Sequence, residues 1–176
     1  IKIERPDREA AAQIFSRYLT GELPLDRQEV DRLGGGDPNK TVQAMIEETV
    51  AEMYRADEEN KFLEVTYQNG DKEVLYFRDF ASGAMIENIV RRAKKLAIKR
   101  SIAGEGDGVR TADLVQSIRR EYKENEDLPN TTNPDDWARI SGKKGERIVY
   151  VRTLLADTEE TRGGRSIERV GTGQYL

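Results

Sequence analysis

The stretch KFLEVTYQNGDKEVLYFR, residues 61–78, decides the fold. In its first half, apolar residues alternate with polar ones, at Leu63, Val65 and Tyr67. This period of two is typical of a half-buried strand. Asn69-Gly70 is a strong signal for a two-residue turn, because both positions tolerate positive φ. A β-prone return segment follows at 74–77, so we predict a β-hairpin over 61–78.

A hairpin needs a further partner, since two strands alone are marginally stable in water. The other β-prone segment of suitable length is Arg147 to Leu155. We therefore predict that a strand at 147–154 pairs with the hairpin. The resulting small sheet closes across a large sequence separation.

Helical spacing of apolar residues flanks the hairpin on both sides. Before it we predict a helix capped by Asp7 after Pro6, a short helix over 25–33 and a long one over 39–55. After it, Ser82 opens a helix that continues to about Arg100, and Thr111 caps another that continues through Tyr122. The predicted fold class is α+β.

Composition restricts the function. The 33 acidic and 29 basic residues give a net charge of -4, which argues against a protein built to hold nucleic acid. The sequence contains no cysteine and no histidine, so disulfides and the commonest general base are excluded. No apolar run approaches the length of about 18 residues that a membrane span needs. The chain begins with Ile1 rather than Met, and we expect it to be a fragment.

Six segments are candidate sites, and each has a plainer interpretation. Ser82-Gly83-Ala84 exposes bare backbone at a helix start, where a flat or anionic group could approach, but it also reads as an ordinary cap. The basic helix 91–100 suits a solvated face better than a nucleic-acid surface. The glycine-rich stretches 34–36 and 104–108 lack phosphate-loop spacing, and Asp135-Asp136 fits a cap beside Trp137. The last residues, Gly173 to Leu176, suit a frayed end and a carboxylate-recognition element equally well.

Several motifs in order resemble one family. They are Arg5-Pro6-Asp7-Arg8-Glu9, the segment from Phe80 to Ala93, the block from Glu126 to Arg139 and the terminal Gly-Gln-Tyr-Leu. Together they resemble the C-terminal region of actinobacterial proteasome-associated AAA ATPases, the Mpa/ARC family. The resemblance implies a helical AAA lid over 1–60 and 79–125, and a β-grasp-like subdomain over 61–78 and 134–156. Residues 157–176 would form a flexible tail with a docking motif.

The resemblance also implies roles for individual residues. Gly83 and Ala84 would lie against the adenine and ribose of a bound nucleotide. Ile14 and Tyr18 would line the base pocket, although Tyr18 replaces the His of many relatives. At the other end, the docking residues would enter cavities in the α-ring of the proteasome core: Gly173, Gln174, Tyr175 and Leu176.

The parent protein implied by this resemblance is a cytoplasmic homohexameric unfoldase that hydrolyses ATP with Mg²⁺ and delivers pupylated proteins to the proteasome. The phosphate loop, the metal-binding acids, the arginine finger and the coiled coil that captures pupylated substrates lie upstream in that family. We therefore expect this chain alone to hydrolyse no ATP and to hold no cofactor. We expect no nucleic-acid or membrane partner. The alternative is a stand-alone β-grasp interaction module that binds no nucleotide.

Overall fold

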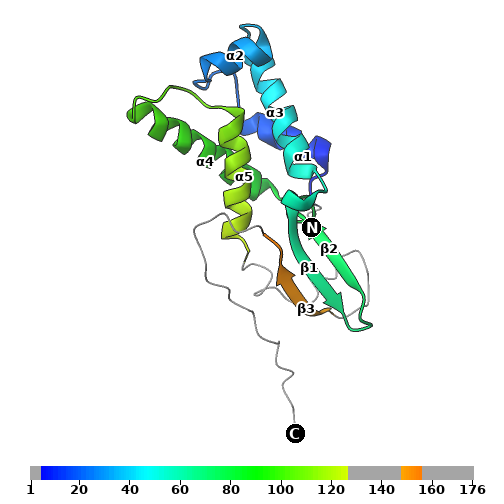
Figure 1. Ribbon diagram of the computed structural model, residues 1–176. Helices are drawn as coiled ribbons and strands as arrows, with labels where there is room; N and C mark the ends of the chain where they lie inside the picture. The colour runs from blue at the N-terminus through cyan, green and yellow to red at the C-terminus, as the bar shows by residue number, and fades with distance from the viewer. Residues whose placement is uncertain (1–4, 127–147, 156–176) are drawn as a thin grey trace.

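The computed structural model describes residues 5–126 and 148–155. Its helices are α1 (Arg8–Tyr18), α2 (Arg27–Gly34), α3 (Pro38–Tyr54), α4 (Gly83–Ile102) and α5 (Thr111–Glu124), with the 3₁₀ turns η1 (Glu58–Asn60) and η2 (Phe77–Phe80). The strands are β1 (Lys61–Tyr67), β2 (Lys72–Tyr76) and β3 (Ile148–Thr153). Helices form one part of the molecule and the small sheet forms the other (Figure 1), which confirms the predicted α+β class.

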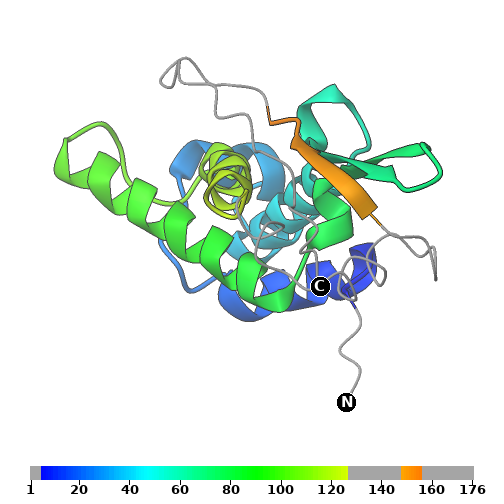
Figure 2. The ribbon, with the colours of Figure 1, turned by 90° about the horizontal axis from the view of Figure 1, so that it is seen from below.

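The sheet joins the hairpin to the late strand. Its order is β2-β1-β3, and β1 pairs antiparallel with both neighbours. Leu63 of β1 is opposite Leu75 on one side and Thr153 on the other. Both ribbon views place β3 alongside β1 (Figures 1 and 2). The predicted hairpin and its predicted partner strand are therefore confirmed.

Side-chain caps fix the helix starts. The Asp7 carboxylate accepts from the Ala10 amide at 2.8 Å, and the Ser82 hydroxyl accepts from the Met85 amide at 3.3 Å, as predicted. The prediction that Thr111 caps α5 is wrong, because Thr111 is already helical and the Asp113 carboxylate binds the Arg110 amide at 2.9 Å. An acidic residue in the first turn thus satisfies the amide at the start of α5.

The short helix begins later than predicted. Asp26 caps it by accepting from the Gln28 amide at 3.0 Å, so α2 starts at Arg27 rather than Leu25. Leu25 instead forms an isolated parallel bridge with Val109. The backbone at this point is used by a distant segment, which a periodicity argument over neighbouring residues does not detect.

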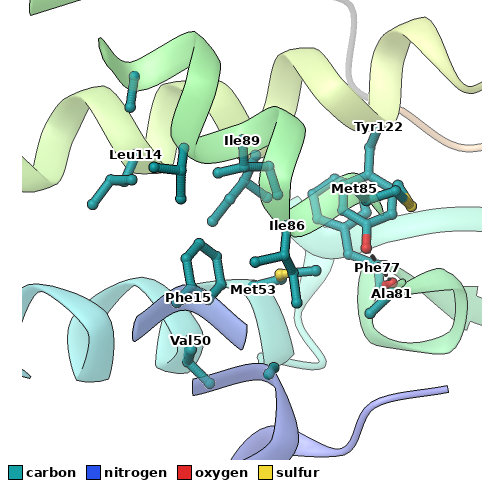
Figure 3. Close-up of a cluster of buried hydrophobic side chains, with 14 of the residues drawn as sticks. Phe15, Val50, Met53, Phe77, Ala81, Met85, Ile86, Ile89, Leu114 and Tyr122 are labelled. Carbon is teal, nitrogen blue, oxygen red and sulfur yellow. Dashed lines mark hydrogen bonds between the residues drawn. The ribbon is translucent and has the colours of Figure 1, made fainter. Parts of the chain in front are cut away.

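One hydrophobic cluster joins the helices to the base of the hairpin (Figure 3). The rings of Phe77 and Tyr122 stack with centroids 4.1 Å apart and an interplanar angle of 5°. Phe62 meets Tyr122 edge-on at 5.4 Å, and the Tyr122 hydroxyl donates to the Phe77 carbonyl oxygen at 2.7 Å. Burial raises the pKa of Tyr122 well above its usual value, so this phenol stays a neutral donor.

The predicted division into a lid and a β-grasp-like subdomain stays a prediction. Part of the second subdomain, residues 134–147, and the predicted tail at 157–176 lie outside the described residues. Among the helices that the structure does describe, none combines the length and the apolar character needed to cross a membrane.

Candidate functional site

The start of α4 lies beside α1 and is open to solvent. Gly83 and Ala84, its first two residues, are both exposed. The first amides of a helix lack intrahelical partners and carry partial positive charge. The Ser82 hydroxyl accepts a hydrogen bond from the Met85 amide, so the interpretation of this segment as a helix cap is confirmed. The cap leaves the exposed edge of the helix start available.

Among the described residues, no steric contact requires glycine at position 83. A Cβ atom added there would approach Ile14 Cδ1 to 4.0 Å, which is an ordinary van der Waals contact. Gly108 differs, since its φ is +85° and a Cβ atom would overlap the backbone of Leu25 and Asp26. The fold therefore requires glycine at 108 but tolerates a side chain at 83.

Tyr18 meets α4 one turn further along. Its hydroxyl donates to Glu87 Oε2 at 3.3 Å, across 69 positions of sequence. Tyr18 follows Ile14 by four residues and Glu87 follows Gly83 by four, so each pair shares one helix face. We call these four residues the α1–α4 ladder: Ile14 with Gly83 forms one rung, and Tyr18 with Glu87 forms the other.

The structure therefore brings together three of the four residues predicted to contact nucleotide, and Ala84 adjoins Gly83. Glu87 was not predicted. Its spacing from Gly83 on a helix would have placed it on the same face, but no sequence signal links it to Tyr18. The ladder combines an apolar side chain, an aromatic ring and the exposed start of a helix. Such a combination suits a flat ring system that also carries polar groups.

A second polar cluster ties α2 to α5. We call it the polar joint; it comprises Asp26, Glu29, Arg110 and Thr111. Arg110 Nε donates to Asp26 Oδ2 at 2.8 Å, and the Thr111 hydroxyl donates to Glu29 Oε2 at 2.6 Å. Burial of Asp26 alone would raise its pKa, but hydrogen bonds from Arg110 and from the backbone amides outweigh it and lower the pKa. These groups satisfy one another, so the joint is structural.

Two arginines of the basic helix, Arg92 and Arg100, also form ion pairs within the chain. Arg92 Nε pairs with the buried Glu121 at 2.9 Å and its guanidinium also binds Glu124; the hydrogen bond to Glu124 is the main cause of its raised pKa. Arg100 pairs with Asp113 at 2.7 Å and donates to the Gly108 carbonyl oxygen at 2.6 Å. Both arginines are thus used inside the chain, which favours a structural interpretation of this helix.

Two further candidate segments lie outside the described residues. Gly173, Gln174, Tyr175 and Leu176 lie outside the described residues, as do Asp135 and Asp136. Within 5–126 and 148–155, no group of three acidic side chains is arranged to hold a metal ion. The α1–α4 ladder is therefore the candidate site on which the structure bears directly.

Comparison with known proteins identifies the relatives. Residues 6–175 match the family of the ARC, AAA+ ATPase lid domain. The chain is 68% identical over 176 residues to the proteasome-associated ATPase of Acidimicrobium ferrooxidans. The similar region includes the whole of this chain and 30% of that protein. It is 62% identical over 177 residues to the corresponding ATPase of Frankia casuarinae, of which it covers 29%, and 63% identical over 177 residues to that of Streptomyces avermitilis, of which it covers 30%. The chain therefore spans less than a third of these curated relatives.

Proposed function

The chain belongs to the ARC, AAA+ ATPase lid domain family, and on this premise we propose that it is the lid and docking region of a proteasome-activating ATPase. The observation that carries the proposal is the match over residues 6–175. Relatives named proteasome-associated ATPase are similar over the whole chain, which supports the same assignment. The parent would be a cytoplasmic homohexamer that unfolds pupylated proteins.

The α1–α4 ladder would form the lid's side of the nucleotide pocket. Glycine at 83 costs helix propensity, and no contact with residues 5–126 or 148–155 requires it. Space reserved for the adenine or ribose of ATP or ADP is a physical reason for a glycine there. Ile14 and Tyr18 would then line the base on one side, while Gly83 and Ala84 would approach the sugar.

Hydrolysis would depend on residues outside this chain. Phosphoryl transfer needs a phosphate-binding lysine, a metal ion and in-line positioning groups acting together. A lid supplies none of these and instead moves with the nucleotide state. We expect the 176-residue chain alone to show no ATPase activity, and turnover by the purified fragment would contradict this assignment.

The C-terminal residues would dock the ring on the proteasome core. The Leu176 carboxylate is suited to a charge-assisted bond with a lysine, and Tyr175 to an apolar cavity between α-subunits. A single such contact is weak. Several on one ring gain through effective concentration, by about 10²–10⁴-fold where the geometry permits simultaneous binding.

Deletion of Gln174, Tyr175 and Leu176 from the full-length ATPase tests the docking proposal. We expect stimulation of degradation by the core particle to be lost, while ATP hydrolysis by the ring continues. Replacement of the same residues by three alanines is the matched control for chain length. Degradation that persists in both variants would rule out the tail as the docking element.

A further inference from the structure

We propose that Glu87 is a positioning residue of the nucleotide pocket: its carboxylate holds the Tyr18 hydroxyl and so fixes the tyrosine ring as a wall of the pocket, one helical turn along α4 from Gly83. This inference rests on the proposed function of the α1–α4 ladder. It assigns Glu87 no direct contact with the nucleotide. The residue would act through Tyr18.

The position of Tyr18 explains why its ring needs support. Tyr18 is the last residue of α1, and the next residue, Leu19, already has an extended backbone. No further helical turn follows to pack against the ring. The Tyr18 side chain is half-buried, so the core does not enclose it completely. A bond from its hydroxyl to another element is then the direct way to restrict its rotamers.

Glu87 comes from an element that holds it in place. It lies in the first two turns of α4, between the fully buried Ile86 and the half-buried Asn88. Asn88 donates to Glu121 Oε1 on α5 at 2.9 Å, which anchors this part of α4. The Glu87 carboxylate is exposed and accepts from Tyr18 at 3.3 Å. A rigid helix thus presents the acceptor to a ring at the end of another helix.

The bond would act by preorganisation. A ring that is already held against Glu87 loses less conformational freedom when a base packs against it, so binding costs less entropy. Solvent competes for an exposed hydrogen bond, which limits the effect. We expect loss of the bond to weaken nucleotide binding by about three- to tenfold.

The experiment uses the full-length ATPase and four variants: Glu87→Ala, Tyr18→Phe, the double variant and Glu87→Gln. A fluorescent ADP analogue gives the dissociation constant, and ATP hydrolysis gives KM and kcat. We expect both single variants to weaken binding equally and to raise KM more than they lower kcat. The double variant should be no worse than either single one, since both changes remove the same bond. Glu87→Gln should retain most of the affinity, because its amide oxygen still accepts.

Controls separate positioning from folding and from the proposed function itself. Glu47→Ala removes an exposed carboxylate on α3 and should leave the affinity unchanged. Gly83→Leu should abolish binding, since the chain tolerates a side chain there but the nucleotide would not. If Gly83→Leu binds normally, the proposed pocket is wrong. If Gly83→Leu fails to bind while Tyr18→Phe binds normally, or if the single losses add in the double variant, the positioning role of Glu87 is wrong and the pocket stands.

Discussion

The starts of α4 and α5 differ in what covers them. At α5, the protein's own groups close the helix start: Asp113 binds the Arg110 amide, and Thr111 and Arg110 reach Glu29 and Asp26 on α2. At α4, Ser82 caps one amide, and Gly83 and Ala84 stay exposed. A helix start that the fold closes serves stability. One that the fold leaves exposed, one helical turn from the Tyr18 ring, is available to a ligand.

Substitution of the two glycines should give the largest contrast between these regions. Gly108→Ala forces a side chain into a φ of +85° and into the backbone of Leu25 and Asp26. We expect it to lower the free energy of unfolding by about 3 kcal/mol or more. Gly83→Ala should instead leave stability unchanged or raise it by up to about 1 kcal/mol, as helix propensity improves. Denaturant titration of both variants measures this, and equal losses would break the contrast.

Arg110→Ala should have the next largest effect. It leaves the buried Asp26 carboxylate without its charged partner, so we expect a loss of about 1–3 kcal/mol in the free energy of unfolding. Arg55→Ala is the matched control, since Arg55 pairs at the surface with Asp57 and Glu59, which lie outside the polar joint. It should change stability little, because exposed ion pairs contribute little. Similar losses in the two variants would mean that the polar joint is not the source of the stability.

Tyr54 tests a third helix start, that of α1. Its hydroxyl donates to the Pro6 carbonyl oxygen at 2.6 Å, just before the Asp7 cap. Burial, and then the nearby Asp7, raise the pKa of Tyr54 from 10.0 to about 12. Because the pKa is higher in the folded state, the neutral phenol contributes its full stabilisation below pH 10.0, the pKa of this residue in the unfolded chain. This stabilisation is lost as the pH rises from 10.0 to about 12. Tyr54→Phe should cost about 1 kcal/mol at neutral pH and should reduce this alkaline loss. Unfolding measured across that pH range would show a parallel decline in both proteins if ionisation of Tyr54 does not contribute to the alkaline loss.

Substitution of Asp26 should have the smallest effect on stability, and this effect should depend on acid pH. Its lowered pKa means that its contribution to stability is present above the ordinary aspartate value and is lost as pH falls through the folded-state value. Asp26→Asn should therefore be less stable at neutral pH and should show a shallower decline on acidification. Thermal unfolding as a function of pH measures the two slopes. Identical slopes would remove Asp26 as a source of the acid dependence.

Local signals in the sequence predicted most of the fold. The hairpin follows from a period of two around Asn69-Gly70, and the caps at Asp7 and Ser82 follow from residue types that bind the next turn. The polar joint gave no such signal, because Asp26 and Arg110 are 84 positions apart. Thr111 is a favoured cap type, but its hydroxyl is used by Glu29 instead. Tertiary partners therefore decided what these residues do.

The candidate site was predictable in part. Family resemblance indicated Ile14, Tyr18, Gly83 and Ala84, and the structure places Ile14 near Gly83. Their contact with nucleotide stays a prediction. Glu87 was missed, since its bond to Tyr18 depends on how two helices pack. The docking residues at 173–176 stay a prediction, as they lie outside the described residues.

Phe62 and Phe77 set the limits for any attempt to transplant or remove the inserted hairpin. In sequence the insert lies between α3 and α4, yet an aromatic ring at each of its ends packs against Tyr122 of α5, Phe62 edge-on and Phe77 stacked. Excision of 61–78 would leave a hole in the helical body. Replacement of 64–74 alone would keep both rings in place and remove the residues that pair with β3 apart from Leu63. The boundary of the exchangeable unit thus lies inside the insert. A minimal lid for protein engineering should retain both phenylalanines.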